Sequence, residues 1–447
     1  MAMTASLEPE IQRVGRVLAS SFASPARHPL KALDEKALDL ASRDAELRAA
    51  LFRFVDVVPA CRSPDDLARH LSAFLGEVDD RPAPLDAAMK MADTKAGARA
   101  LGLAATAGVR HMAHRFIVGE TTADALPLLR SLWDHGVATS VDLLGEATIT
   151  VVEADRYAAR CSDALRTLHE ESARWPPRPG LEQDSTGALP RVNLSVKVSA
   201  LTPLLRPEAP EVGKRDAARR LRDLMRLARD LGAHLHVDME SLDSRETVLG
   251  LVLELLAEEE FAGGPSAGVV IQAYLRDSPQ TLDEVLDWAG ACDRAQPLVV
   301  RLVKGAYWDQ EIVEARRHGW SAPVFEAKAD SDRNFEALTR RLLESRPLVR
   351  VAIASHNLRS VAQAMAYNQA LGAPDGDLEL QVLRGLGDDL QDALAKQGLR
   401  VRTYCPVGDL VAGMAYLVRR LLENTSNESF LAARMHDASI EDLLAAP

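Results

Sequence analysis

Cysteine is scarce in this sequence, and the four cysteines that occur are scattered. Cys61, Cys161, Cys292 and Cys405 lie far apart and form no Cys-x-x-Cys pair. Zinc and iron–sulfur sites gather cysteines at short spacing, so this pattern argues against both. It also favours a reducing compartment, in which cysteines are mostly small core residues.

Long apolar runs and an excess of basic residues are absent as well. No stretch approaches the roughly 20 apolar residues that span a bilayer, and the first residues lack the basic start and apolar core of a signal peptide. The formal net charge of −12 argues against nucleic acid as a general partner. We therefore expect a globular protein, for which 47% hydrophobic and 26% charged residues are ordinary values.

A glycine-rich dinucleotide loop is also missing. The nearest approach, Gly385-Leu-Gly387, lacks the third glycine and follows no first strand–helix turn. If a dinucleotide binds this chain, it does not bind in the Rossmann manner.

The first part of the chain, residues 1–110, has the pattern of helices without a strand signal. Ser63 and Pro64 indicate a helix start, with serine as the cap and proline at the first helical position. The alanine-rich stretch 86–112 predicts one long helix by propensity. We expect a helical arm or cap here rather than half of a sheet domain.

Residues 111–430 show candidate strands that alternate with helices, the signature of parallel βα units. Eight strands each followed by a helix favour an α/β fold, namely a (βα)8 TIM-like barrel, over the alternative of a doubly wound open sheet. The candidate strands lie at 138–144, 192–199, 233–240, 268–275, 299–303, 349–356, 378–383 and 399–404.

The segments between and after the strands complete this picture. Helices are expected at 216–231, 281–295, 334–345 and, as the last helix, about 410–424. The segment 176–190 is rich in proline and glycine and is expected to be a loop. The tail at 431–447 has no clear closing feature, which is what a piece of a longer chain would show.

Two charged residues interrupt the strand at 299–303. Arg301 lies among β-branched residues of a strand that should be covered on both faces, and Lys304 follows it. Because side chains alternate along a strand, these two point in opposite directions. A buried charge costs several kcal/mol unless it is paired. Arg301 therefore either forms a plain buried ion pair or awaits an anionic or electron-accepting group.

Polar residues recur near the carboxyl ends of nearly all the candidate strands, where barrel enzymes place their chemistry. So many polar groups at one edge are better explained by a shared pocket than by solvation of loops. They are Asp142, Glu146, Lys197, Ser199, Asp238, Glu240, Gln272, Arg301, Lys304, His356, Asn357 and Tyr404.

The last predicted helix adds a polar face to this set. Arg419, Arg420 and Glu423 follow Tyr416 at helical spacing. Two adjacent arginines can clamp a carboxylate or a phosphate. The alternative is a solvated face with an internal Arg–Glu pair, although the leucines and valine between these residues indicate a largely buried helix.

Parts of the sequence also suggest two other functions. His234, His236 and Asp238 place three potential metal ligands on one strand face, as in metal-dependent hydrolases. Those enzymes use the first strand, whereas this is the third, and the cationic groups at the same edge would repel a divalent ion. A non-catalytic scaffold barrel would leave the inward charges unexplained.

The sequence resembles proline dehydrogenase, in particular the proline dehydrogenase part of the bifunctional bacterial proline utilisation flavoenzymes. The matching motifs run in the same order from about residue 110 to 430. They are Asp142-Leu-Leu-Gly-Glu-Ala147, Leu194-Ser-Val-Lys-Val-Ser-Ala-Leu201, Val270-Ile-Gln-Ala-Tyr-Leu-Arg276, Arg301-Leu-Val-Lys-Gly-Ala-Tyr-Trp-Asp309, Ser355-His-Asn357 and Tyr416-Leu-Val-Arg-Arg-Leu-Leu-Glu-Asn424.

This resemblance implies a distorted barrel that holds FAD non-covalently. It implies oxidation of L-proline to Δ1-pyrroline-5-carboxylate by hydride transfer to the flavin, the first step of proline catabolism to glutamate. The electrons would pass to a membrane quinone, so the protein would be cytoplasmic with a peripheral contact at the inner face of the membrane. No metal is implied.

The resemblance also assigns roles to residues. Asp238 and Arg301 would be catalytic, with Arg301 near the reactive flavin nitrogen. Proline would be held through its carboxylate by Lys197, Arg419 and Arg420, and enclosed by Leu383, Tyr404 and Tyr416. The cofactor site would comprise Met239, Gln272, Arg301, Lys304, Gly305, Ala306, Trp308, Ser355, His356, Asn357 and Glu423, the last of which would orient the arginine pair.

The chain departs from the family pattern in three respects. Ser355 stands where the family often has threonine, which keeps the hydroxyl group. The ribbon–helix–helix DNA-binding segment of some longer members is missing, as is the aldehyde dehydrogenase domain with its cysteine nucleophile. We therefore expect the chain to form the pyrroline product but not to oxidise its hydrolysis product to glutamate.

Overall fold

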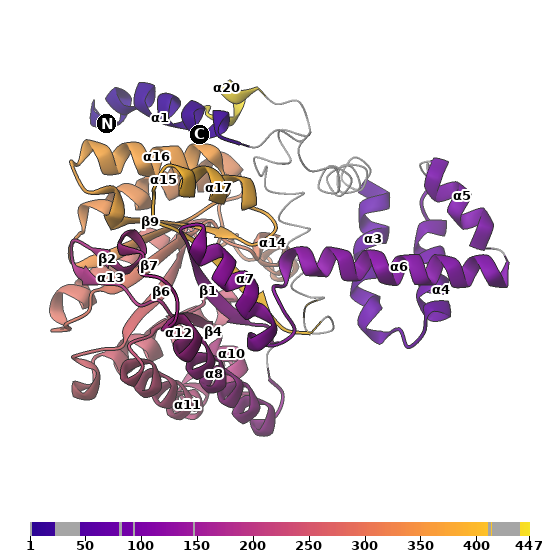
Figure 1. Cartoon of the computed structure of the whole chain (residues 1–447), viewed down its shortest axis with the longest axis horizontal. Helices are drawn as coiled ribbons and strands as arrows, with labels where there is room; N and C mark the ends of the chain where they lie inside the picture. Colours follow the sequence, from indigo (N-terminus) through magenta and orange to yellow (C-terminus); the bar gives the residue numbers. More distant parts are fainter. Residues whose placement is uncertain are drawn as a thin grey trace.

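Eight parallel strands close into a barrel (Figure 1). The computed structural model describes residues 2–22, 45–79, 83–92, 94–145, 148–409, 413 and 439–447. The barrel strands are β1 (Val137–Leu143), β4 (Asn193–Val196), β5 (His234–Val237), β6 (Ser266–Gln272), β7 (Leu298–Val303), β8 (Val349–Ala354), β9 (Leu378–Leu383) and β10 (Val401–Val407). Their order around the barrel is β1-β10-β9-β8-β7-β6-β5-β4. The predicted TIM-like barrel is confirmed, and the open-sheet alternative is wrong.

Two strands are shorter than their sequence pattern suggests. β4 ends at Val196 and β5 at Val237, although apolar alternation continues to residues 199 and 240. The pairing of β1 with β4 covers only two residue pairs, Val141 with Leu194 and Asp142 with Ser195. Lys197 and Asp238 therefore lie immediately beyond the ends of their strands, at the carboxyl rim of the barrel.

The interior of the barrel is unusually polar. TIM barrels commonly fill this space with branched aliphatic side chains, whereas here inward positions carry hydrogen-bonding groups. The Ser140 hydroxyl donates to Asn193 Oδ1 at 2.7 Å, and Arg402 bonds both carboxylate oxygens of Glu379 at 2.9 and 3.0 Å. Buried polar groups need such partners, so this interior is held together largely by specific pairs. Its other polar members include Ser195, His234, His236, Arg301 and Gln381.

Helices surround the barrel and bury its apolar outer face. They are α7 (Thr122–Asp134), α8 (Val151–Ser172), α10 (Val198–Leu201), α11 (Pro210–Asp230), α12 (Leu242–Leu256), α13 (Ser278–Ala291), α14 (Trp308–His318), α15 (Lys328–Glu344), α16 (Leu358–Ala370) and α17 (Asp388–Lys396). Short 3-10 turns lie at η3 (Glu259–Phe261) and η4 (Asp375–Asp377). The helices predicted at 216–231, 281–295 and 334–345 are confirmed as α11, α13 and α15, each of which starts earlier than its apolar pattern indicates.

A helical arm projects from one side of the barrel (Figure 1). It consists of α3 (Ala45–Val57), η2 (Val58–Ala60), α4 (Pro64–Gly76), α5 (Ala83–Ala92) and α6 (Lys95–Phe116). The predicted start of α4 is confirmed, because the Ser63 hydroxyl accepts a hydrogen bond from Asp66 N at 3.1 Å and Pro64 opens the helix. The arm has its own apolar core, which includes Leu47, Phe54 and Leu71.

The prediction of one continuous helix over 86–112 is wrong. That stretch divides into α5 and α6, and α6 has its own cap, because the Thr94 hydroxyl accepts a hydrogen bond from Gly97 N at 3.1 Å. The alanine-rich composition favours helix on both sides of the break. Helix propensity alone therefore did not reveal that Thr94 starts a new helix. α6 reaches the barrel at its end, where Arg115 Nε donates to Gly385 O at 3.1 Å.

The first helix, α1 (Ala2–Ser20), lies on the barrel rather than in the arm, beside α16 and the short C-terminal α20 (Ile440–Leu443) (Figure 1). Arg359 of α16 ties these segments together. Its guanidinium donates to Glu336 Oε1, Glu8 Oε1 and Leu444 O, each at 2.7 Å. One buried arginine, Arg359, therefore binds both the first helix and the segment around Leu444 near the other end of the chain.

The segment 176–190 was expected to be a loop, and this is wrong in part. It contains α9 (Pro179–Glu182) and an antiparallel hairpin of β2 (Gln183–Asp184) and β3 (Gly187–Ala188). Asp184 of the hairpin accepts hydrogen bonds from Arg350 of β8 at 3.0 and 3.4 Å. The hairpin thus contacts the amino end of the barrel interior.

The helix predicted at 410–424 lies outside the described residues apart from Gly413. Of the tail at 431–447, the described part contains α20, and Leu444 is fully buried against the main core.

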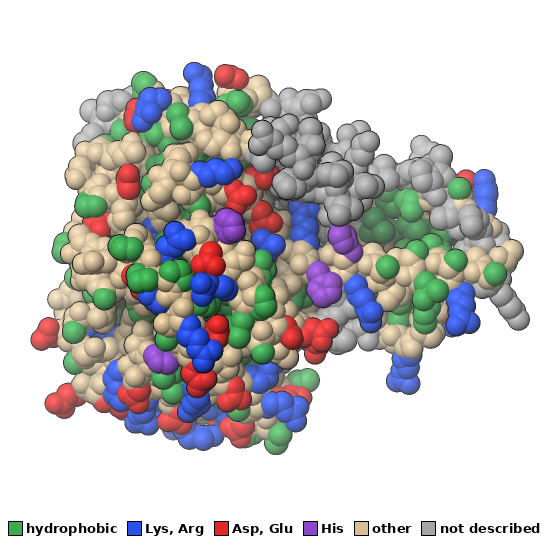
Figure 2. Space-filling model, in the orientation of Figure 1, with side chains coloured by type: hydrophobic (Ala, Val, Ile, Leu, Met, Phe, Trp, Pro, Cys, Tyr) green, Lys and Arg blue, Asp and Glu red, His purple; other side chains and the backbone are tan. Residues whose placement is uncertain are grey.

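The visible surface of the barrel carries basic and acidic side chains side by side (Figure 2). Helix α11 illustrates the pattern, since Arg222 bonds Glu258 at 2.6 Å and Arg226 bonds Glu260 at 2.8 Å. A nucleic-acid-binding face would instead show a continuous basic stripe. Among the described residues, no helix is both long and apolar enough to span a membrane.

Candidate active site

Five side chains from five strands meet near the carboxyl end of the barrel, and we call them the charged layer: Asp142, Lys197, Asp238, Arg301 and Tyr404. They come from β1, β4, β5, β7 and β10 or from the residues just after these strands. Lys197, Asp238, Arg301 and Tyr404 were all predicted as site residues. Barrel closure brings them together, although they span more than 200 residues of sequence.

Arg301 is almost entirely buried and faces inward, as predicted. Its Nη1 bonds Asp238 Oδ1 at 2.8 Å, its Nη2 lies 3.4 Å from Ser195 Oγ, and its guanidinium carbon lies 5.4 Å from the centre of the Tyr404 ring. The buried ion pair, one of the two alternatives that the sequence left open, is therefore present. Its Nε is nevertheless buried without a hydrogen-bond partner among the described residues.

Asp238 is the acceptor on which this layer converges. Besides Arg301, the Tyr404 hydroxyl donates to Asp238 Oδ2 at 2.5 Å, and Lys197 Nζ lies 3.6 Å from the same oxygen. Burial raises the pKa of Tyr404 well above its usual value, so the phenol stays protonated and can donate. Asp238 thereby fixes a cation and a phenol on neighbouring sides of one carboxylate.

Lys197 is held in its charged form. Its ammonium donates to Asp142 and also lies near Asp238. Burial by itself would lower the pKa of Lys197, but the attraction of Asp142 and then Asp238 more than offsets this and raises the pKa. The backbone N–H of Lys197 donates to the Tyr157 hydroxyl at 3.3 Å, which anchors the segment after β4.

Asp142 was noted from the sequence as a strand-end residue but received no role. Its carboxylate is 1% exposed, and its described ion pair is with Lys197. The signal was available, because Asp142 has the inward parity of Ser140 in the same strand. Which cation it meets depends on the closure of β1 onto β4, which sequence alone does not give.

The described residues that were predicted for the cofactor lie along the same rim, on or just after β5, β6, β7 and β8. Gln272 Nε2 donates to Glu240 O at 3.2 Å, while its Oε1 is buried without a partner among the described residues. Met239 is partly buried against the main core. Glu240 accepts the bond from Gln272 through its backbone carbonyl, and burial raises the pKa of its carboxyl group.

Lys304 turns away from Arg301, as the alternation along β7 predicted. Its ammonium bonds Asp332 of α15, and burial lowers its pKa despite that partner. Gly305 and Ala306 follow at the rim. Gly305 has a φ of +133°, and a side chain there would meet the Tyr274 ring, so glycine is required. Trp308 opens α14, is 38% exposed, and donates to Phe325 O at 2.9 Å.

Ser355, His356 and Asn357 follow β8 and have clear local partners. Asn357 caps α16 by accepting from Ser360 N at 2.9 Å, and the Ser355 hydroxyl accepts from Asn357 N at 3.1 Å. His356 Nε2 accepts from Leu383 N at 2.8 Å. These bonds rigidify the segment and bring His356 beside Leu383, which was predicted to line the substrate site.

Four predicted site residues, Tyr416, Arg419, Arg420 and Glu423, lie outside the described residues. Their predicted roles therefore remain predictions.

The possible metal ligands of β5 are arranged differently from a metal site. His234 Nε2 and His236 Nδ1 are 3.1 Å apart, and His234 Nδ1 bonds Ser266 Oγ at 2.9 Å. Burial lowers the pKa of His234 to about 3, so the ring is neutral. Within the part of the chain that the structure describes, no group of three or more His, Cys, Asp or Glu residues could hold a metal ion.

Comparison with known proteins supplies the family. The proline dehydrogenase family model matches residues 125–433, and the model of the proline utilization A N-terminal domain matches residues 8–116. The chain belongs to the proline dehydrogenase family. All five residues of the charged layer, and the predicted arginine pair at 419–420, fall within the proline dehydrogenase match.

The sequences of individual relatives support this family membership. The bifunctional protein PutA of Salmonella typhimurium is 34% identical over 348 residues, which cover 76% of this chain and 25% of that protein. Proline dehydrogenase 1 of Bacillus subtilis (strain 168) is 26% identical over 327 residues, covering 72% of this chain and 90% of that one. The chain thus spans about a quarter of the length of the PutA relatives.

A solved structure of the family matches throughout. The crystal structure of PutA from Bdellovibrio bacteriovorus inactivated by N-propargylglycine superposes with a TM-score of 0.88 at 35% sequence identity. The match covers 100% of this chain and 44% of that one. The barrel and the N-terminal helices are therefore arranged as in a proline utilization A protein.

Proposed function

We propose that this chain oxidises L-proline to Δ1-pyrroline-5-carboxylate, the first step of proline catabolism to glutamate. In this reaction a hydride leaves the ring carbon beside nitrogen, a C=N bond forms, and the amine proton is released. The proposed hydride acceptor is non-covalently bound FAD, which a membrane quinone would reoxidise at the inner face of the membrane. The observation that carries the proposal is the charged layer, which lies at the carboxyl end of the barrel within the proline dehydrogenase match.

The electrostatics of the charged layer indicate how the substrate carboxylate would be bound. Lys197 and Arg301 are the cations of the layer, and Asp142 and Asp238 are its carboxylates, so its formal charges balance. A substrate carboxylate would add a negative charge to a buried site and would need further cations. Arg419 and Arg420 are the proposed source, with Lys197 as the third contact and with Glu423 orienting the pair.

The ring of proline requires an apolar enclosure beside these charges. Tyr404 offers its ring face while its hydroxyl is fixed on Asp238. Leu383 is fixed nearby through its backbone bond to His356, and Tyr416 is proposed as the third wall. A substrate held by both carboxylate and ring keeps one C–H bond in a constant position, which is a large part of catalysis.

The residues at the rim fit a polar heterocyclic cofactor. Arg301 Nε and Gln272 Oε1 are a donor and an acceptor that are buried without partners among the described residues. Bound FAD would supply the acceptor for the hydride. The residues proposed to hold it are Met239, Gln272, Arg301, Lys304, Gly305, Ala306, Trp308, Ser355, His356 and Asn357.

Asp238 and Arg301 are proposed to act as a unit. The carboxylate holds the guanidinium at 2.8 Å, so a positive charge is positioned before the reaction and costs no reorganisation during it. The same carboxylate fixes Tyr404. Asp238 would thus align Arg301 with the charge that develops during the reaction and would align Tyr404 with the substrate ring.

The direct test is product formation by the FAD-supplemented protein with a dye as electron acceptor. We expect stoichiometric Δ1-pyrroline-5-carboxylate from L-proline, trapped as its adduct with an aromatic aminoaldehyde, and none from D-proline. Substoichiometric or absent product with FAD-loaded protein would refute the proposed reaction.

The arginine pair gives a second prediction. Arg419→Met and Arg420→Met should each lower kcat/KM for L-proline by about 30-fold, mainly through KM, because a charge-assisted hydrogen bond contributes about 2 kcal/mol. Arg341→Met serves as the matched control, since Arg341 forms a half-exposed pair with Asp283 on the outer helices. An unchanged KM in both site variants would exclude the clamp.

A further inference from the structure

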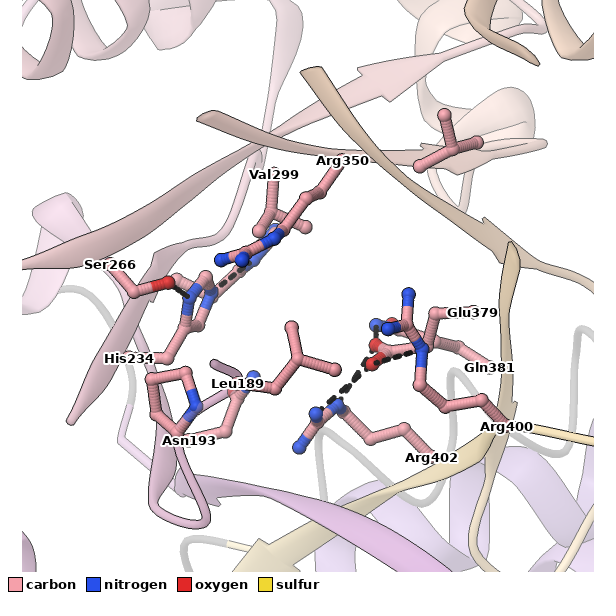
Figure 3. A pocket seen from close by; sticks show the side chains of 13 residues that line it. Leu189, Asn193, His234, Ser266, Val299, Arg350, Glu379, Gln381, Arg400 and Arg402 are labelled. Carbon is pink, nitrogen blue, oxygen red and sulfur yellow. Dashed lines mark hydrogen bonds and ion pairs between the residues drawn. The ribbon is translucent and has the colours of Figure 1, made fainter. Parts of the chain in front are cut away.

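A small cavity lies at the amino end of the barrel interior, next to the β2–β3 hairpin (Figure 3). Among the described residues that line it, none belongs to the charged layer. Its volume is about 20 Å³, and its polar lining includes His236, Arg350, Glu379, Arg400 and Arg402. Leu189 and Pro190, which follow the hairpin, also line it. The charged side chains here are at least nine-tenths buried.

The charges around this cavity do not balance. Arg350 is paired with Asp184 at 3.0 Å, and Arg402 is paired with Glu379 through two bonds. Arg400 shares these same two carboxylates, at 3.4 Å from Asp184 and 3.7 Å from Glu379. Three guanidinium groups therefore face two carboxylates, which leaves one buried positive charge in excess.

Arg400 is where this excess is concentrated. Its side chain is 2% exposed, and its Nε, which lies 3.7 Å from Glu379 Oε2, has no hydrogen-bond partner among the described residues. An arginine does not lose its proton in a protein, so the charge cannot be removed by titration. A buried positive charge in excess of its carboxylates costs several kcal/mol, and an anion in the cavity would offset this cost.

The histidines beside the cavity supply hydrogen-bond donors without adding charge. Burial lowers the pKa of both His234 and His236, so both rings are neutral. His236 Nε2 is buried without a partner among the described residues, and it belongs to the same lining as Arg400. The tautomer with a proton on Nε2 would present an N–H for the same ligand.

The size and charge of the cavity select the ligand. A volume of about 20 Å³ exceeds the roughly 10–15 Å³ that one water requires, and a dianion such as sulfate would overcompensate the single excess charge. A water would fill the space but leave the excess charge. We propose that this cavity binds one monovalent anion of the size of chloride, with Arg400 as its principal partner and His236 as a second donor.

This anion would couple the hairpin to the barrel. Asp184 and Thr186 of the hairpin segment bond Arg350, while Arg400 reaches the same Asp184. With the anion bound, the third guanidinium no longer competes for these carboxylates. The anion therefore stabilises the closed amino end of the barrel and has no part in proline oxidation.

The deciding experiment is anomalous diffraction from crystals of the full chain, grown without halide and soaked in sodium bromide. We expect one anomalous peak in the cavity, within hydrogen-bond distance of Arg400 Nε, and no such peak in crystals soaked in sodium gluconate. A cavity that is occupied by water alone after bromide soaking would overturn the proposal.

Thermal unfolding provides the solution counterpart. At constant ionic strength, replacing gluconate by chloride should raise Tm saturably by a few degrees, whereas sulfate should not reproduce the saturable rise. Arg400→Met should abolish the chloride-dependent shift, and Arg53→Met, which removes an exposed arginine of the arm, should retain it. An equal Tm in chloride and gluconate for the unmodified protein would contradict the proposed site even if the Arg400 variant fails to fold.

Discussion

Replacing Arg301 by methionine is expected to slow the oxidation of L-proline by about 100- to 1000-fold, the loss found when one preorganised donor is removed from a site where charge develops. Arg301 is 4% exposed, and its guanidinium is positioned by Asp238 at 2.8 Å. Its charge is therefore fixed in place before the reaction. The measurement is the rate constant of anaerobic flavin reduction at saturating L-proline, which isolates the chemical step from quinone turnover.

The design of this test separates charge from folding. Asp238 keeps Tyr404 and Lys197 as partners when Arg301 is lost, so the variant should remain folded. Arg301→Lys should recover part of the rate because it restores the positive charge without the fork geometry. Arg341→Met should reduce at the normal rate. If Arg301→Met is reduced as fast as the unmodified protein, Arg301 has no role in the chemistry.

Replacing Glu379 by leucine is expected to destabilise the barrel by about 3–5 kcal/mol, because it leaves a buried cation uncompensated. Glu379 accepts two bonds from Arg402 and lies 3.7 Å from Arg400. Burial would raise the pKa of Glu379, but Arg402 and then Arg400 more than offset this and lower it. The stabilisation is therefore present above the pKa of an unfolded glutamate, about 4.3, and is lost in acid as the folded carboxylate becomes protonated.

A double variant distinguishes charge burial from simple loss of packing. Glu379→Leu with Arg402→Met removes the pair as a unit and should cost clearly less than Glu379→Leu alone, as measured by urea unfolding near pH 7. Glu77→Leu, which breaks an exposed pair with Arg53, is the control and should cost less than about 1 kcal/mol. A double variant that is less stable than Glu379→Leu alone would contradict this explanation. It would show that the cost of Glu379→Leu does not come from leaving the Arg402 charge uncompensated.

The barrel could be predicted from the sequence because its strands and helices have local sequence patterns. Strands such as 349–354 and 378–383 have apolar, β-branched patterns with helices between them, and the alternation along β7 predicted that Arg301 and Lys304 point in opposite directions. The position of polar groups at strand ends predicted a common site. These inferences use only the direction of a side chain and the end of a strand, both of which are local properties.

The partners of the buried charges could not be predicted, since they depend on closure. Arg301 and Asp238 are 63 residues apart in the sequence, and Tyr404 and Asp238 are 166 residues apart. From the sequence alone, Asp238 could equally have faced another cation. The polar interior at the amino end could not be predicted for a similar reason. Arg350, Arg400 and Arg402 lie at the starts of strands, and the hairpin that meets them has the composition of a loop.

The most direct test of the account is the visible spectrum of the purified, FAD-supplemented protein before and after anaerobic addition of L-proline. The proposed function predicts a yellow protein that retains its flavin through gel filtration and whose flavin absorbance bleaches when L-proline is added. A preparation that is colourless and cannot be reconstituted with FAD, or a bound flavin that stays oxidised with saturating L-proline, would contradict it.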